Sequence, residues 1–148
     1  MRISAKGRYA LCALMEIAAR TSKNEPVSVI SVAEKLGISK IFLEQTISQL
    51  KRAEILHSTK GKNGGYTLTR SPSKITVREV LFAVESALFE KTEALSPEES
   101  PSTAAALDYL LWSPLDRDID RRLNGVSIQD LLDYKVSLDV DSAYMLNM

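Results

Sequence analysis

Two helices joined by a short turn that contains one glycine constrain the fold of this chain more than any other feature of its sequence. Ser28 can cap the first helix, VISVAEKLG, which ends at Gly37, a residue suited to the left-handed conformation after a helix. Ser39 can cap the second helix over residues 40–54, in which apolar residues recur at helical spacing. Ala33, four residues before the glycine, would let the two helices cross closely. The segment therefore predicts a helix–turn–helix.

A glycine-rich hairpin is expected directly after this unit, and a further helix before it. Polar and apolar residues alternate in ILHST and GYTLTR, which predicts two short strands with a tip at KGKNG. Ser4 can cap an amphipathic helix over residues 5–21. Gly61, Gly64 and Gly65 precede no Lys-Ser/Thr pair, so the tip matches neither a P-loop nor a dinucleotide-binding fingerprint. An ordinary hairpin turn with exposed lysines stays open as an alternative.

The second half of the chain is expected to be helical, with one irregular segment. Thr76 opens a T-x-x-E capping box before a helix over about 77–86, whereas residues 87–103 lack periodicity and are expected to form a loop. A long helix then carries a leucine or isoleucine every four residues up to an Asn-Gly pair, and Ser127 can cap a last short helix, IQDLLDY. Pro114 lies inside the long helix, where it would kink it, break it or restart it.

These elements predict a mainly α fold with one small β-hairpin. We expect a winged helix-turn-helix domain over residues 1–85, a linker over 86–103 and a helical region over 104–148 that contains a long C-terminal helix. No apolar run approaches the roughly 20 residues that a membrane span needs, and the N-terminus lacks the apolar core of a signal peptide. A single cysteine, Cys12, is typical of a reducing cytoplasm.

A formal net charge of zero conceals a strong segregation of charge along the chain. Residues 1–74 contain 13 Lys and Arg against 5 Asp and Glu, whereas residues 75–148 contain 6 against 14. A basic half is the electrostatic footprint of a surface that binds a polyanion such as nucleic acid. The alternative is a chance imbalance of solvated faces.

Catalytic patterns are absent from the sequence, so we do not expect an enzyme. The only histidine, His57, falls in an expected strand away from any cysteine or paired carboxylate, which favours a structural or surface role. Cys12 is expected to be a buried, inert thiol, because nothing near it in sequence would lower its pKa. No H-E-x-x-H, C-x-x-C or G-x-S-x-G arrangement is present.

DNA binding explains more of these residues together. The N-terminal end of the helix after Ser39 would enter the major groove, where Gln45 can read adenine and Glu44 can accept a hydrogen bond from cytosine. The hairpin would be a wing whose Lys60 and Lys62 meet a phosphate ridge or a narrow minor groove. Basic residues around the cap at Ser4 could hold phosphates from the other side.

Three motifs in the first 68 residues resemble the winged helix-turn-helix regulators typified by IscR and CymR: MRISAKGRYAL, ISKIFLEQTISQLKRAEIL and STKGKNGGYTL. The ending AYMLNM is similar to the CymR-like, cysteine-metabolism branch. The resemblance implies a bacterial repressor that binds a pseudo-palindromic operator in double-stranded DNA as a homodimer, through a long helix over about 102–124. Residues 104–148 are therefore expected to be a dimerisation and regulatory region.

Two sets of candidate site residues follow. The candidate DNA contacts are Arg2, Ser4, Lys6, Tyr9, Ser28, Ser39, Lys40, Ile41, Glu44, Gln45, Ser48, Lys60, Gly61, Lys62, Asn63 and Tyr66. The candidate dimer contacts are Leu107, Leu111, Trp112, Leu115, Ile119 and Leu123.

The sequence departs from the family pattern at two places. Lys60 stands where the motif usually has Arg, and Lys lacks the planar guanidinium that reads a minor groove. Cluster-binding members carry three cysteines in a segment that corresponds to about residues 85–107, and this segment has none. We therefore expect no cofactor and no metal.

The signal that this regulator senses stays open. A small molecule near the loop and dimer interface, a redox change at Cys12, and a protein partner are the alternatives, and the CymR resemblance makes cysteine synthase the first partner to test. A winged-helix module that binds protein without binding DNA is the alternative function.

Overall fold

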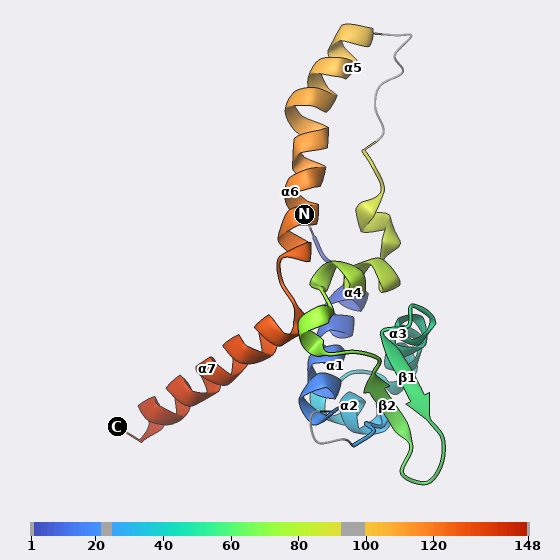
Figure 1. Ribbon diagram of the computed structural model, residues 1–148, viewed down its shortest axis with the longest axis vertical. Coiled ribbons are helices and arrows are strands. Elements are labelled where there is room, and N and C mark those ends of the chain that lie inside the picture. The colour runs from blue at the N-terminus through green and yellow to red at the C-terminus, as the bar shows by residue number, and fades with distance from the viewer. Residues whose placement is uncertain (1, 22–24, 93–99, 148) are drawn as a thin grey trace.

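The computed structural model describes residues 2–21, 25–92 and 100–147 (Figure 1). In chain order the elements are α1 (Ala5–Thr21), α2 (Val29–Leu36), α3 (Lys40–Arg52), β1 (Leu56–Thr59), β2 (Gly65–Leu68), α4 (Val77–Val84), α5 (Pro101–Leu107), α6 (Ser113–Asn124) and α7 (Ile128–Leu146). Figure 1 shows α1 to α4 and the hairpin gathered in one body, from which the α5–α6 helix and α7 project in different directions. None of the helices in the described ranges is long and apolar enough to cross a membrane.

The core lies between the helices of the body, and α1 contributes one continuous stripe to it. Ala10, Leu14 and Ile17 are fully buried, at the i, i+4, i+7 spacing of a single helical face. Leu43 and Ile47 of α3 are equally buried and belong to the same cluster. The mainly α fold with a small hairpin is therefore confirmed.

The expected burial of Cys12 is wrong. Its thiol is exposed, because Cys12 lies between Ala10 and Leu14 on the turn of α1 that faces away from the core. A 3.6-residue repeat that buries positions 10, 14 and 17 carries position 12 to the opposite side.

The two strands form an antiparallel hairpin in which Leu56 pairs with Leu68. His57 lies on the exposed face, where its Nε2 is 2.7 Å from Oγ1 of Thr67 on the opposite strand, which agrees with the surface role expected for it. Backbone hydrogen bonds also tie the hairpin to the segment before α2: Tyr66 donates to the carbonyl of Val27 at 2.8 Å and Val27 donates back at 2.9 Å. The wing is thus anchored to the body along one edge.

Matching capping boxes begin α4 and α7 side by side. Thr76 accepts a hydrogen bond from the backbone N–H of Glu79, and Ser127 accepts one from the backbone N–H of Asp130. The backbone N–H of Ile128 donates to the carbonyl of Ile75 at 2.9 Å, and the Ile128 side chain is fully buried. The first turn of α7 is therefore fixed to the body, as the sequence predicts for both caps.

Pro114 does not break the long helix. Residues Asp108–Trp112 form one π-helical turn, in which the backbone N–H of Ser113 donates to the carbonyl of Asp108. The wider turn relieves the clash that a proline ring makes with the carbonyl four residues earlier, and α6 continues directly with Pro114 in its first turn. The side chain of Ser113 also donates to Asp108 at 2.9 Å.

Three expected boundaries differ from the structure. The last helix runs to Leu146 instead of ending near Tyr134, because no Gly or Pro interrupts it and an ion pair of 2.8 Å joins Lys135 to Asp139 one turn later. The helix after Thr76 ends at Val84, and a 3-10 turn over Ser86–Phe89 follows it. Part of the expected loop, residues 93–99, lies outside the described residues, and α5 begins at its end.

Candidate nucleic-acid interface

The helix–turn–helix is built by α2, Gly37 and α3. Ser28 caps α2 by accepting a hydrogen bond from the backbone N–H of Ser31 at 3.2 Å. Gly37 takes the left-handed conformation with φ 67°, and the backbone N–H of Ile38 then returns to the carbonyl of Ala33 at 3.0 Å. Ala33 is 5% exposed, so its small side chain lies inside the helix crossing, as expected.

One face of α3 is free of the body and carries the residues predicted to read DNA. The residues Leu43, Thr46, Ile47 and Leu50 are buried on its inner face. All six candidates on this helix and its cap are exposed: Ser39, Lys40, Ile41, Glu44, Gln45 and Ser48. Ile41 is 72% exposed although it is apolar, which is the exposure that a contact with a thymine methyl would require.

The side chain of Ser39 does not cap α3 as the sequence predicts. Ser39 holds the N-cap position, but its hydroxyl makes no capping hydrogen bond; its backbone carbonyl accepts from the N–H of Leu43 at 3.0 Å. An ion pair of 3.6 Å joins Lys40 to Glu44 across the exposed surface of α3. The Ser39 hydroxyl is therefore available to another partner, and Glu44 lies beside a cation.

The start of α1 is joined to α3 by an aromatic contact that sequence reasoning missed. The ring of Tyr9 meets the ring of Phe42 edge-to-face, with centroids 5.6 Å apart. Ser4 accepts a hydrogen bond from the backbone N–H of Gly7 at 3.2 Å, which is the predicted cap. Arg2 is exposed and Lys6 is half-buried. Tyr9 therefore acts here as a spacer between two helices, a role that only the contact with Phe42 reveals.

The wing tip is exposed, whereas its base packs on the body. The exposed tip residues are Lys60, Gly61, Lys62 and Asn63, as the sequence predicts. Gly65 is required by packing, because a Cβ there would lie 2.6 Å from the backbone carbonyl of Val27. Tyr66 is half-buried against the core, so its ring belongs to the base of the wing. Alternation in the sequence predicts the strands but carries no signal for the pairing with Val27.

A cavity of about 480 Å³ brings the start of α2 and the wing tip together. Ser28, Asn63 and Gly64 line it, along with Arg20 at the end of α1. Arg20 donates to the hydroxyl of Ser31 at 2.9 Å and pairs with Glu16 at 2.8 Å. Sequence reasoning missed Arg20, since nothing in α1 alone indicates that its last turn reaches α2.

The carboxylate of Glu16 forms ion pairs with two basic residues where α1 meets α2. Lys35 of α2 lies 3.0 Å from Glu16, in addition to Arg20. Burial raises the pKa of Glu16, but the hydrogen bonds from Lys35 and Arg20 outweigh it and hold the pKa below its ordinary value. The ionised carboxylate therefore fixes α2, and with it the helix–turn–helix, against α1.

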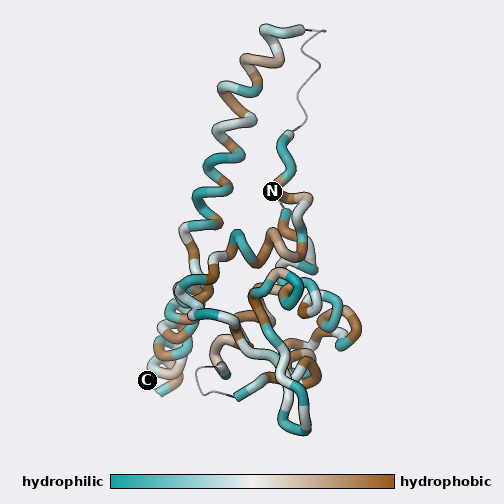
Figure 2. Tube along the Cα trace, turned by 45° about the vertical axis from the view of Figure 1, so that its right-hand side comes forward, coloured by the Kyte–Doolittle hydropathy of each residue, from teal (hydrophilic) through white to brown (hydrophobic). Residues whose placement is uncertain are grey.

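The candidate dimer residues lie along the projecting α5–α6 helix. Leu111 and Leu115 are 44% and 47% exposed, and Figure 2 shows that apolar positions recur along this helix outside the body. The other four candidates, Leu107, Trp112, Ile119 and Leu123, are half-buried. An unpartnered row of large apolar side chains on a projecting helix marks an interaction surface.

The metal-ligating residues of this chain do not fit an iron–sulfur cluster. Such clusters need several cysteine thiolates, and the sequence has one cysteine, which lies on the exposed side of α1. Within the described ranges, no three His, Cys, Asp or Glu side chains gather in a way that could hold a metal ion.

Comparisons with known proteins agree with this arrangement of wing and recognition helix. The chain matches the Rrf2 family, described as iron-dependent transcriptional regulator, over residues 3–134. It is 34% identical over 140 residues to the HTH-type transcriptional regulator IscR of Photorhabdus laumondii, which covers 95% of this chain and 84% of that protein.

Two solved structures extend the similarity to the fold. CymR, the global cysteine regulator of B. subtilis, superposes with a TM-score of 0.77 and 30% identity, over 90% of this chain and 98% of that one. The IscR of T. potens superposes with a TM-score of 0.71 and 29% identity, over 91% and 88%. These relatives are DNA-binding regulators and not enzymes, and the chain belongs to the Rrf2 family of transcriptional regulators.

Proposed function

We propose that this regulator is a homodimeric repressor that binds a pseudo-palindromic operator without an iron–sulfur cluster. The observation that carries the proposal is the exposed face of α3, where polar side chains and an exposed isoleucine stand opposite a fully buried face of the same helix. A helix that is buried on one side and polar on the other suits the major groove.

The proposed contacts divide into those that read bases and those that hold phosphates. Glu44 and Gln45 would read base edges, with Glu44 leaving Lys40 for a cytosine amino group. Lys60 and Lys62 at the wing tip, with Arg2 before α1, would neutralise phosphates. Phosphate contacts set affinity and its dependence on salt, whereas base contacts set sequence preference.

Homodimerisation is proposed through the α5–α6 helix. Its exposed leucines, Leu111 and Leu115, form an apolar surface that a second copy would cover. A two-fold dimer would set two α3 helices on half-sites about one helical turn apart.

The absence of a cluster is proposed from the single cysteine, in contrast to the iron-dependent description of the family. The similarity to CymR supports control of sulfur or cysteine metabolism and makes cysteine synthase a protein partner to test. The similarity to IscR is comparable in extent, so similarity alone does not select the regulated genes. Selection of operators from genomic DNA, with and without cysteine synthase, tests whether they are genes of sulfur or cysteine metabolism.

The wing is tested by replacing both of its lysines, as Lys60→Ala plus Lys62→Ala. Binding to specific and random DNA should weaken together. The slope of log K against log salt should fall by about one for each phosphate that is no longer neutralised, so by about two per subunit. The matched control is Lys74→Ala plus Lys135→Ala, which removes the same charge from the turn after the hairpin and from α7. Equal salt slopes for the two double variants would contradict the wing assignment.

The reading role of α3 is tested with Glu44→Ala in the same selection experiment. The variant should keep its salt slope and lose preference at one base position of each half-site, by about 1–3 kcal/mol. An unchanged preferred sequence would show that Glu44 faces no base.

A further inference from the structure

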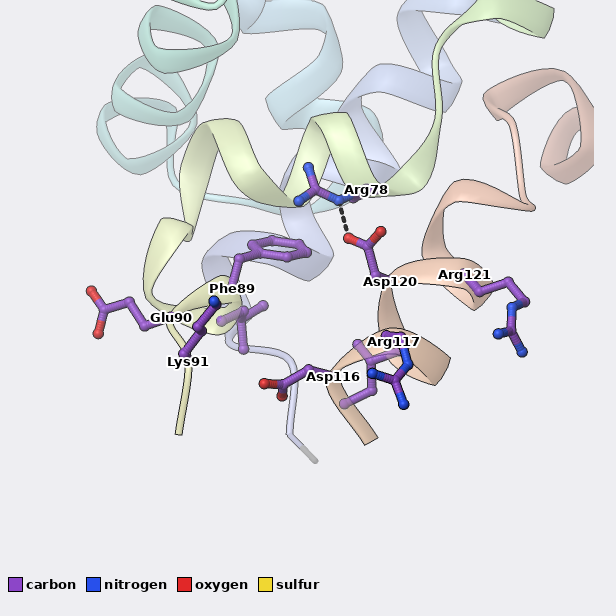
Figure 3. Close-up of a pocket in the computed structure, with 10 residues that line it drawn as sticks. Arg78, Phe89, Glu90, Lys91, Asp116, Arg117, Asp120 and Arg121 are labelled. Atoms are coloured by element: carbon purple, nitrogen blue, oxygen red, sulfur yellow. Dashed lines mark hydrogen bonds and ion pairs between the residues drawn. The ribbon is translucent and has the colours of Figure 1, made fainter. Parts of the chain in front are cut away.

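A cavity of about 470 Å³ lies between α6 and the 3-10 turn that follows α4, outside the proposed DNA interface (Figure 3). Its apolar wall is formed by Leu88, Phe89 and Ile119, and charged side chains surround the rest. A volume of this size is in the range of sites for small molecules.

Arg78 of α4 is held at this cavity by two aromatic rings and one carboxylate. Its guanidinium lies 4.8 Å from the ring centroid of Phe89 and 5.6 Å from that of Phe82, so two aromatic rings hold its plane. Its Nε donates to Asp120 of α6, and among the described residues its Nη1 and Nη2 have no acceptor. An arginine held in this way has free guanidinium N–H groups that can donate to both oxygens of a carboxylate.

The remaining charges leave the cavity receptive to an anion. Lys91 and Arg117 have no ion-pair partner among the described residues, whereas Arg121 pairs with Asp118 at 3.3 Å and points away from the cavity in Figure 3. The acidic side chains are Glu90, which points away in Figure 3, Asp116, which is unpaired within the same ranges, and Asp120, which Arg78 neutralises.

We propose that this cavity binds a small carboxylate with an apolar body, which takes the place of Asp120 on Arg78. The ligand carboxylate meets Nη1 and Nη2 of Arg78 with Lys91 beside it, and its apolar part lies on Leu88 and Phe89. Asp120 is 45% exposed and its other carboxylate oxygen accepts a hydrogen bond from Asn124 at 3.1 Å, so it keeps a partner on α6 when it leaves Arg78.

The exchange has a consequence for the whole molecule, because Arg78 and Asp120 form an ion pair between α4 of the body and the projecting α6. A ligand that breaks this pair loosens the long helix from the body and so changes the spacing of the two α3 helices in a dimer. The effect on DNA rests on the proposed function, whereas binding of the carboxylate does not.

Three probes with the same four-carbon skeleton test the ligand class: butyrate, butyramide and butylammonium. Each is titrated into the full-length protein without DNA, and the Nε–Hε signal of Arg78 is followed by NMR. Butyrate should bind and shift this signal, whereas the neutral amide and the cation should not. Equal binding of butyramide, or no binding by any of the probes, would overturn the proposal.

Variants of the ion pair test the proposed exchange in both directions. Arg78→Gln should lower the affinity for butyrate by about tenfold or more, because it removes charge-assisted hydrogen bonds. Asp120→Asn removes the competing carboxylate and should raise the affinity for butyrate by about two- to fivefold. The matched control Arg122→Gln changes an exposed arginine of α6 that does not line the cavity, and should leave the affinity unchanged. Weaker binding by Asp120→Asn would refute the exchange, even if Arg78→Gln failed to fold.

The regulatory consequence is read separately, from operator affinity with and without butyrate. The wild type should change its affinity on adding butyrate, and Arg78→Gln should not respond. A wild type that binds butyrate and operator independently would overturn the coupling. A protein that binds no DNA at all would refute the proposed function and leave the NMR result standing.

Discussion

Replacing Gly65 by alanine should dislodge the wing from the body. The added Cβ would lie 2.6 Å from both the carbonyl carbon and the carbonyl oxygen of Val27, and 2.9 Å from its nitrogen. These are backbone atoms, so no side-chain rotation can make room. The strand must move away, and the two hydrogen bonds between Val27 and Tyr66, of 2.8 and 2.9 Å, are then broken.

The magnitude follows from the interactions that this movement removes. Two backbone hydrogen bonds contribute about 1–3 kcal/mol together to the free energy of unfolding. Partial exposure of the Tyr66 ring adds about 1 kcal/mol. We therefore expect Gly65→Ala to lower the free energy of unfolding by about 2–4 kcal/mol, and to weaken DNA binding if the wing acts as proposed.

Urea denaturation followed by circular dichroism, at one fixed protein concentration, measures this destabilisation. Gly37→Ala is the matched control, because a Cβ there meets no atom within 4 Å and only the left-handed backbone, with φ 67°, opposes it. That strain costs about 1 kcal/mol. If Gly65→Ala loses no more stability than Gly37→Ala, the contact with Val27 does not require glycine and the packing argument is wrong.

Two further predictions concern the α1–α2 junction and the dimer. Glu16→Gln should lower the free energy of unfolding at pH 7 by about 1 kcal/mol. Burial raises the pKa of Glu16, but the hydrogen bonds from Lys35 and Arg20 outweigh it and hold the pKa below its ordinary value. The carboxylate therefore stabilises the fold above its unfolded-state pKa, and the difference from wild type should vanish as pH falls through the folded-state pKa. Urea titrations across acid pH measure this, and a gap that widens in acid would contradict it. Leu111→Asp plus Leu115→Asp should yield monomers in analytical ultracentrifugation, whereas Val140→Asp on α7 should not; a dimeric double variant would place the interface elsewhere.

Local signals predicted the helix starts well because a cap is completed within one turn of the chain. Ser4, Ser28, Thr76 and Ser127 all accept the expected backbone hydrogen bonds. Ser39 is the exception: it holds the N-cap position, but its hydroxyl makes no bond there. A cap residue fixes where a helix begins, while the rotamer of its side chain depends on the surroundings.

The candidate DNA contacts on α3 were predicted to share one face, and their exposure agrees with that, because a helical repeat orders them. The role of Tyr9 beside Phe42, and the reach of Arg20 to α2, could not be predicted in the same way. These pairs join residues of different helices, and no periodicity within one helix encodes its distance from another.

The sequence alone determined the order of the elements, the ends of most helices and the glycine-rich wing, because each depends on neighbours within a few positions. The segregation of basic from acidic residues can also be counted directly along the chain. The π-helical turn before Pro114, the extension of α7 to Leu146 and the exposure of Cys12 were not predicted, although each depends on residues of a single helix. Packing alone pairs Arg78 with Asp120, 42 positions away, across the base of the long helix. Such pairs form only when the core has set the helices against each other, because the chain between the two residues does not encode their distance in space.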